Sequence, residues 1–244
     1  MSLITIITVV YNSRDMLRET IESVKRQSFR DFDYIVVDGG SSDGTLDVIK
    51  DNDGLITKWI SEPDSGIYDA MNKGMKLAGE SHLLFLNAGD VFSGPDVLES
   101  ASPYLDGHDV VYGDIYVEGI KKRNYLKAKD FTLDNIKKYD TGTLCHQAMF
   151  VRKSKAPEYD AGLRYKAELN WYIDLLGAIP RENIIHIGIP VVNYKLGGKG
   201  YNDFLRNRAE LAGVFMRRFG ICSIFNINFI IRQLKALKWR YLNS

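Results

Sequence analysis

The sequence predicts an α/β protein with a doubly wound, mainly parallel sheet, because apolar strand-like runs alternate with stretches of helical periodicity over its first hundred residues. Residues 3–10 are rich in β-branched side chains, which is typical of a strand buried on both faces. Residues 14–28 then place apolar side chains at helical spacing, with acids near the start and bases near the end. Strand–helix units of this length join parallel strands through right-handed crossovers.

The next elements continue this alternation. They are expected, in chain order, as strand 34–37, helix 45–50, strand 57–60, helix 66–79 and strand 82–86. In the helix over 66–79, apolar side chains such as Ile67, Met71 and Met75 share one face. The first half of the chain therefore supplies four parallel strands and the helices between them.

The second half is less regular. Strands are expected at 109–117, 147–152 and 184–192, helices at 168–176 and 203–219, and a basic, polar connection at 121–144. The segment after Glu210 contains no acidic residue but six basic ones: Arg217, Arg218, Arg232, Lys235, Lys238 and Arg240. Because apolar residues are interleaved with these bases, the segment is expected either to lie on an anionic membrane surface or to pack on the domain or a second subunit.

Composition restricts the class of protein. The net charge of +1 gives no reason to expect a nucleic-acid partner. Two distant cysteines, Cys145 and Cys222, indicate a reducing compartment without a disulfide framework. Cys145 and His146 lack a second ligand pair at zinc-site spacing. With no signal-peptide pattern and no run of about 20 apolar residues, a cytoplasmic protein is expected.

The loops that follow the predicted parallel strands carry unusual polar residues. Ligands of such sheets bind outside the carboxyl ends of the strands. Tyr11 follows the first strand and offers a ring for stacking on a base, while Asp38 follows the second and offers a carboxylate to a base N–H or a ribose hydroxyl. The small residues of 39–45, among them Gly39, Ser41 and Asp43, let a ligand approach the backbone at a helix N-terminus.

The loop after the fourth strand reads Asn87-Ala88-Gly89-Asp90 and offers oxygen ligands to a hard divalent cation such as Mg²⁺ or Mn²⁺. A base site, a glycine-rich turn and a metal carboxylate together predict a pocket for a nucleoside diphosphate.

Five strings in order resemble the family-2 glycosyltransferases, most closely the bacterial branch that assembles exopolysaccharide, colanic-acid-type and O-antigen units. These strings are TVVYN (8–12), IVVDGGSSDGT (35–45), SEPDSGIYDAMNKG (61–74), FLNAGD (85–90) and HQAMF (146–150). The resemblance covers most of residues 3–200. It implies a Rossmann-like GT-A fold, a UDP- or GDP-sugar donor, a bridging divalent cation, inversion at the anomeric carbon and a saccharide or lipid-linked saccharide acceptor.

The resemblance also divides the chain into a nucleotide-sugar half (1–100), an acceptor half (101–202) and a basic C-terminal tail (203–244), and it places the enzyme in the cytoplasm or peripherally on the inner face of the plasma membrane. It implies that Asp90 binds the metal. The implied nucleotide-binding residues are Thr8, Tyr11, Asp38, Gly39, Ser41, Asp43, Asp69, Lys73, Asn87 and Ala88, and the implied acceptor residues are His146, Gln147 and Trp171.

Two positions depart from the family pattern. Asn87 and Gly89 stand where many members carry metal-binding acids, so that Asp90 is the only carboxylate of that motif. Asn170 aligns with the usual catalytic Asp, and a neutral amide cannot accept the acceptor's proton. Glu168, two residues earlier, is the first candidate base, and Asp174, one helical turn beyond Asn170, is the second.

Structural roles compete with these functional ones. Asp38, Asp43 and Asp90 are also suited to turns and helix caps, and Asp69 and Lys73 to a surface i,i+4 pair. Trp171 stacks on an acceptor sugar or packs in the core. The alternatives to an active enzyme are a catalytically silent, glycosyltransferase-like binding protein, motivated by Asn87 and Asn170, and a sugar-nucleotide-forming nucleotidyltransferase. The latter would need a basic glycine-rich loop after the first strand, which this chain lacks.

Overall fold

The structure, a computed structural model, describes residues 2–118, 123–139, 144–195, 203–226, 229–231 and 233–234. A single sheet runs through the molecule, with strand order β3-β2-β1-β4-β8-β6-β9-β5 and with β7 paired to β6. The strands are β1 (Ile4–Val10), β2 (Phe32–Asp38), β3 (Lys58–Ser61), β4 (His82–Phe85), β5 (Val91–Phe92), β6 (Val110–Glu118), β7 (Arg123–Leu126), β8 (Met149–Arg152) and β9 (Ile184–Lys195).

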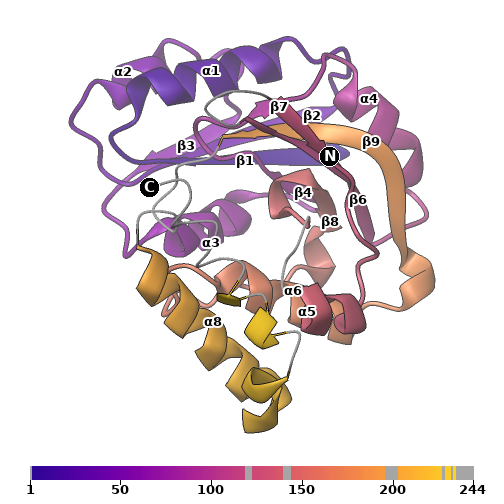
Figure 1. Ribbon diagram of the computed structural model, residues 1–244. Helices are drawn as coiled ribbons and strands as arrows, with labels where there is room; N and C mark the ends of the chain where they lie inside the picture. The colour runs from indigo at the N-terminus through magenta and orange to yellow at the C-terminus, as the bar shows by residue number, and fades with distance from the viewer. Residues whose placement is uncertain are drawn as a thin grey trace.

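Helices cover both faces of the sheet (Figure 1). They are α1 (Arg14–Lys25), α2 (Thr45–Lys50), α3 (Ile67–Leu77), α4 (Val97–Ala101), α5 (Leu133–Tyr139), α6 (Ala167–Ala178) and α8 (Phe204–Phe219). One apolar cluster joins α1, α2 and α4 to the sheet, and a second joins α3, α5, α6 and α8 to its other face. Because all seven residues of β1 are buried between these clusters, the apolar run at 3–10 is explained by burial on both faces.

The four strands of the first half are parallel, as predicted. β1 pairs with both β2 and β4, and β3 pairs with β2. Gly74 lets α3 lie close to the sheet, because a Cβ at this position would stand 2.5 Å from Ile7 Cγ2. Because β1 is a parallel neighbour of both β2 and β4, the carboxyl ends of these three strands lie side by side at one edge of the sheet.

The second half adds antiparallel strands to this frame. β8 runs antiparallel to both β4 and β6, whereas β9 runs parallel to β6. The strand expected at 184–192 extends to Lys195, and its pairing with β6 shifts register near Asp114. At the shift, a Cβ on Gly113 would stand 2.5 Å from the Ile189 carbonyl oxygen, so the irregularity places two backbones in close contact.

The prediction of a basic, polar connection at 121–144 is wrong for the described part of this segment. This segment contains β7 and α5, and it buries Phe131 and Ile136 in the second apolar cluster. Its few apolar residues are separated by charged ones, so no regular spacing of apolar residues predicts either element. Residues 119–122 and 140–143 lie outside the described residues.

Helix α8 packs on the domain. Leu211, Val214 and Phe215 are buried in the second cluster. The carboxylate of Glu210 accepts hydrogen bonds from the backbone N–H groups of residues 164–166, at distances down to 2.7 Å, just before α6 begins. The start of the 203–244 segment is therefore part of the packed structure, while residues 235–244 lie outside the described part.

No helix in the described part of the chain combines the length and the apolar character that crossing a bilayer requires.

Candidate functional site

The loops after β1 and β2 are joined into one unit at the carboxyl edge of the sheet. The backbone N–H of Asn12 donates to Ser41 Oγ at 2.7 Å, and Asn12 Oδ1 accepts from the N–H of Ser42 at 2.9 Å. Asn12 adopts a positive φ of 45°, a conformation that Asn tolerates better than most residues. The two loops that were predicted to share a nucleotide are thus held together before any ligand binds.

Asp38 lies at the floor of this unit and is fully buried. Its carboxylate accepts hydrogen bonds from the N–H and the hydroxyl of Ser41 and from the hydroxyl of Ser61, at 2.5–3.0 Å. These donors fix the orientation of the carboxylate and shape the loop around it. Asp38 and Ser41 therefore have a clear structural role at the position where a nucleotide was predicted.

Tyr11 lies on the open side of the same loops and exposes 56% of its surface. A Cβ on Gly39 would stand 3.2 Å from Tyr11 Cδ2 and 2.4 Å from Asp64 Oδ2, so only glycine lets these two side chains flank the backbone here. An exposed aromatic ring beside a side-chain-free backbone suits the face of a flat base. Asp64 was missed in the sequence; its signal was the Pro-Asp-Ser-Gly turn inside the matched string.

Two predicted nucleotide contacts have partners within the protein. Thr8 is fully buried, and its hydroxyl donates to the Leu86 carbonyl at 2.7 Å and lies 3.0 Å from Tyr34 Oη, so it cannot reach a ligand in the loops. Asp43 accepts from the N–H of Arg14 and from the N–H and hydroxyl of Thr45, and it thereby connects the starts of α1 and α2. The hydrogen bond from Thr45 is the main cause of its lowered pKa.

Asp69 and Lys73 hold the loop that carries Asp64. Asp69 accepts from the N–H of Ser65 at 3.0 Å. Lys73 Nζ lies 2.8 Å from Glu62 Oε1, 3.8 Å from Asp69 Oδ2 and 2.9 Å from the Pro63 carbonyl oxygen. Both side chains therefore support the 62–66 loop from its α3 side.

Asp90 is buried at the end of the loop that follows β4. One carboxylate oxygen accepts from the N–H of Lys195 at 2.9 Å, and the other accepts from Nε2 of Gln147. Burial raises the pKa of Asp90 to about 7, although these hydrogen bonds oppose the shift. Gln147, predicted to contact the acceptor, instead orients Asp90 and accepts a hydrogen bond from Cys145 Sγ at 3.1 Å.

The donor set around Asp90 fits a hard cation with few protein ligands. Within the described residues, no three His, Cys, Asp or Glu side chains gather closely enough to hold a metal ion by themselves. Asn87 Oδ1 is buried on the same turn and has no hydrogen-bond partner among those residues, and Ala88 between them is half-buried. A carboxylate and an amide oxygen are ligands that Mg²⁺ and Mn²⁺ accept, with phosphate oxygens and water completing the shell.

Glu168 lies in the first turn of α6 and is mostly buried. Its Oε2 accepts a hydrogen bond from the hydroxyl of Tyr68 on α3, and its Oε1 lies 3.8 Å from Lys166 Nζ. Burial, and to a smaller extent the charges of Asp90 and Glu168, raises the pKa of the Cys145 thiol to about 12. A chain of contacts connects the candidate base with the candidate metal ligand: Tyr68 stacks on Tyr159, whose ring meets that of His146, and the next residue, Gln147, donates to Asp90.

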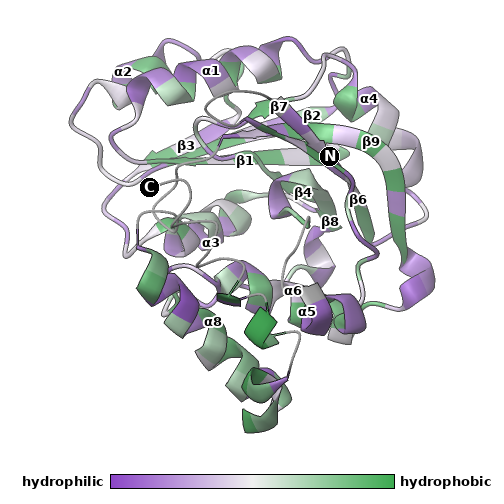
Figure 2. Cartoon of the chain, in the orientation of Figure 1, coloured by the Kyte–Doolittle hydropathy of each residue, from purple (hydrophilic) through white to green (hydrophobic). Residues whose placement is uncertain are grey.

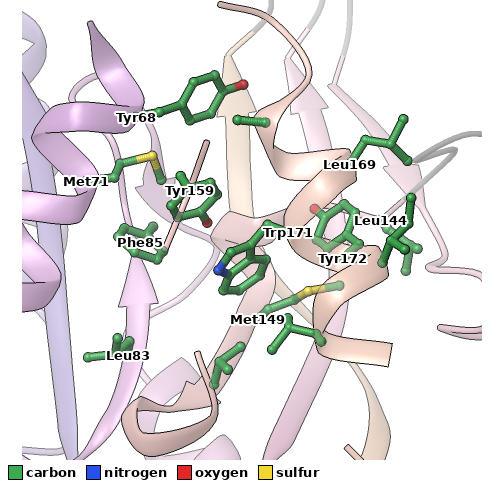
Figure 3. Close-up of a cluster of buried hydrophobic side chains, with 14 of the residues drawn as sticks. Tyr68, Met71, Leu83, Phe85, Leu144, Met149, Tyr159, Leu169, Trp171 and Tyr172 are labelled. Carbon is green, nitrogen blue, oxygen red and sulfur yellow. The ribbon is translucent and has the colours of Figure 1, made fainter. Parts of the chain in front are cut away.

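The other two predicted groups on α6 contact other parts of the protein. Asp174 pairs with Arg218 of α8 near the surface. Trp171 is only 1% exposed and stacks on Tyr159 at 5.1 Å between ring centroids, so the prediction that it stacks on an acceptor sugar is wrong (Figure 3). Its indole N–H donates to the Pro157 carbonyl at 2.8 Å. A nearly all-round apolar helix is typical of burial, which explains why Trp171 packs.

His146 is enclosed by aromatic rings. Its ring meets those of Phe85 and Tyr159 edge-on at 6.3 and 6.1 Å, and its Nε2 is buried without a hydrogen-bond partner in the described part of the chain. Burial lowers its pKa to about 4, so the imidazole is neutral near pH 7.

This neutral imidazole predicts a loss of stability in acid. His146 becomes protonated near pH 6.5 in the unfolded chain but only near pH 4 in the folded chain. The free energy of unfolding therefore keeps its full contribution from this residue above pH 6.5 and falls as the pH drops from 6.5 to 4. The expected loss from this residue is about 3 kcal/mol. Urea unfolding of the wild type and His146→Gln at pH 7.5 and pH 4.5 measures it. The variant should lose less stability on acidification; an equal loss in both proteins would contradict the assignment.

Comparison with known proteins shows the family to which the chain belongs. The sequence profile described as glycosyl transferase family 2 matches residues 5–159. The chain belongs to that family. The family-2 glycosyltransferase described here is 33% identical over 174 residues to a PGL/p-HBAD biosynthesis glycosyltransferase of Mycobacterium bovis, covering 68% of this chain and 66% of that protein. It is 34% identical over 106 residues, 42% of each chain, to a putative teichuronic acid biosynthesis glycosyltransferase of Bacillus subtilis.

Solved structures show that the glycosyltransferase has the GT-A fold. Residues 1–349 of S. aureus TarS in complex with UDP superpose with a TM-score of 0.68 at 17% identity, over 88% of this chain and 65% of that one. A mannosyltransferase of Pyrobaculum calidifontis, in complex with GDP-Man and Mn²⁺, superposes with a TM-score of 0.58 at 16% identity, over 88% and 63% of the two chains. The predicted fold class is confirmed.

Proposed function

We propose that this glycosyltransferase moves a sugar from a nucleoside-diphosphate donor, of the UDP class, to a saccharide acceptor with inversion at the anomeric carbon. The observation that carries the proposal is the position of two carboxylates, the buried Asp90 and the mostly buried Glu168, which a chain of contacts connects, beside loops that present Tyr11 to solvent. Asp90 would hold the cation at the diphosphate, and Glu168 would take the proton of the acceptor hydroxyl. A UDP donor is supported by the TarS complexes with UDP and UDP-GlcNAc.

The nucleobase of the donor would lie against Tyr11, with Gly39 and Asp64 beneath it and with Asp38 holding the loop in place. The diphosphate would then extend toward Asn87 and Asp90. A divalent cation held by these two oxygen donors and by the phosphates would neutralise the charge that develops on the leaving diphosphate. Gln147 and the Lys195 N–H keep the Asp90 carboxylate oriented for this role.

On the acceptor side, Glu168 would take the proton of the attacking hydroxyl. The acceptor oxygen forms the new bond to the anomeric carbon, the bond from that carbon to the phosphate oxygen breaks, and the electron pair leaves with the diphosphate. General-base assistance of this kind contributes about 10²–10⁴-fold in rate. Inversion would follow because the acceptor oxygen would attack the face of the sugar opposite the leaving diphosphate.

The acceptor is proposed to be a lipid-linked saccharide of bacterial surface polysaccharide synthesis. Support comes from the relatives' names, which refer to PGL/p-HBAD biosynthesis and to teichuronic acid biosynthesis. Exposed apolar side chains on and after α8 are those of Leu205, Ile221, Phe225 and Leu234. Figure 2 shows hydrophobic stretches of the ribbon in this region in green. Together with Arg217 and the basic residues that follow, these side chains suit peripheral contact with an anionic bilayer.

Incubation of the enzyme with UDP- and GDP-sugars, Mn²⁺ and a lipid-linked saccharide extract tests this function. Release of the nucleoside diphosphate from one donor, with an acceptor extended by one sugar of inverted configuration, is the expected result. Binding of a donor without release or transfer, under every metal and acceptor, would favour the catalytically silent protein instead. Sedimentation with phosphatidylglycerol vesicles, compared with neutral vesicles, tests the membrane contact separately; equal recovery with both would contradict it.

A further inference from the structure

A hydrogen bond joins the donor side of the enzyme to its candidate base. Tyr68 is the second residue of α3 and is 7% exposed, and its hydroxyl donates to Oε2 of Glu168, a hundred residues later in the chain. No local pattern in the sequence connects these two residues. The bond crosses from the helix that follows the donor loops to the helix that begins the acceptor side.

The ring of Tyr68 is fixed by a stack of aromatic side chains. It stacks on Tyr159 at 5.6 Å with an interplanar angle of 20°, and Tyr159 in turn stacks on Trp171 of α6 at 5.1 Å and 9° (Figure 3). Because Trp171 and Glu168 belong to the same helix, the stack sets the distance between the phenol and the carboxylate. The hydroxyl is therefore held in place before any substrate binds.

Several titratable groups surround Glu168. Lys166 Nζ lies 3.8 Å from Oε1. The charge of Glu168 acts on Tyr68 of α3, Tyr159, Tyr172 of α6, Tyr194 of β9 and Cys145, while Asp90 acts on Cys145 and Glu210 on Tyr68. Burial, and then the charge of Glu168, raises the pKa of Tyr68 well above its ordinary value, so the phenol is a permanent donor.

The start of α3 also belongs to the donor site. Asp69, the residue after Tyr68, accepts from the Ser65 N–H and so holds the 62–66 loop, in which Asp64 lies against Gly39. The first turn of α3 thus contacts both the loops proposed to bind the nucleobase and the proposed catalytic carboxylate. A side chain at this place can align the two halves of the reaction.

We propose that Tyr68 is a positioning residue, which keeps Glu168 as a carboxylate and directs its second oxygen toward the acceptor hydroxyl. The inference rests on the proposed function, in which Glu168 is the base. Oε2 accepts the phenolic hydrogen, and Oε1, which lies 3.8 Å from Lys166 Nζ, is the oxygen that would take the proton of the acceptor. Loss of the phenol removes a donor that favours the charged carboxylate and frees the side chain to leave its reactive orientation.

Tyr68→Phe tests the proposal, with Tyr159→Phe as the matched control. Tyr159 belongs to the same stack, but its hydroxyl is buried without a hydrogen-bond partner among the described residues. For Tyr68→Phe we expect kcat to fall about 10–100-fold, as for a lost hydrogen bond to a charged group. The acid limb of the kcat–pH profile should move to higher pH, while the donor KM and the Kd of the free nucleotide stay within twofold. Tyr159→Phe should keep the wild-type kcat and pH profile.

The nucleotide Kd reports folding independently of catalysis. If Tyr68→Phe binds nucleotide normally and keeps the wild-type kcat and pH profile while Glu168→Gln is inactive, the positioning role is overturned and the proposed base stands. If Glu168→Gln itself retains activity, the base assignment fails first. An equal loss of kcat in both phenylalanine variants, with unshifted pH profiles, would assign the effect to packing of the stack and also overturn the proposal.

Discussion

Replacement of Glu168 by Gln is expected to lower kcat by about 10²–10⁴-fold, because a neutral amide cannot take the acceptor's proton. The substitution keeps the volume of the side chain and can still accept from Tyr68, so donor binding should change little. Steady-state kinetics with the identified donor, together with calorimetric binding of its nucleotide, measures both quantities. The signature of a base is a large loss in kcat at a nearly unchanged donor Kd.

Asp174→Asn is the matched control. It lies on the same helix, but its carboxylate pairs with Arg218 near the surface, on the α8 side. The expected result is wild-type kcat and a loss of stability below about 1 kcal/mol, as for an exposed ion pair. The reverse pattern, with Asp174→Asn inactive and Glu168→Gln active, would move the base to the second candidate.

Replacement of Asp90 by Asn should abolish the response to the metal and lower kcat by at least about 10²-fold, because the charge on the leaving diphosphate is then left without its counter-ion. Titration of nucleotide binding with and without Mn²⁺ measures the first effect. Asp47→Asn, an exposed change on α2, should leave the metal response intact. A metal response that survives Asp90→Asn would remove Asp90 from the metal site.

The Asp90→Asn variant should be more stable than the wild type at high pH in the absence of metal. The folded-state pKa of about 7 lies above the ordinary value of 3.8, so stability is full below pH 3.8 and falls as the pH rises to 7. The buried carboxylate accordingly costs up to about 4 kcal/mol at pH 8, a cost that the amide does not carry. Denaturation at pH 5 and pH 8 measures it; an equal effect of Asp90→Asn at both pH values would contradict this account. A function-bearing residue that lowers stability is common in enzymes.

The first half of the fold could be predicted because its signals are local. The run at 3–10 is apolar throughout, since β1 is buried on both faces. The alternation of strands and helices then placed Tyr11 and Asp38 at one sheet edge without any three-dimensional information. Segments with few apolar residues, such as the one that holds β7 and α5, gave no such signal and depend on tertiary contacts.

The site was predicted in position better than in detail. The contacts that define it join residues far apart: Gln147 with Asp90 is separated by 57 residues and Tyr68 with Glu168 by 100. Periodicity cannot show which of two acids on one helix faces a pocket, and the structure separates Glu168 from Asp174 by what each contacts. Trp171 was assigned by residue type alone, and its burial shows the limit of that reasoning.

The measurement that tests the central claim most directly is thermal unfolding with UDP, GDP, CMP and their sugars, each with and without Mn²⁺, for the wild type, Asp90→Ala and Tyr11→Ala. A nucleotide at 100 times its Kd adds about 2.7 kcal/mol of stability. The account predicts that UDP raises the melting temperature strongly only with metal, that Asp90→Ala removes the metal dependence and that Tyr11→Ala weakens the effect of every uridine ligand. No shift with any nucleotide under any metal would contradict a donor pocket at the carboxyl edge of the sheet.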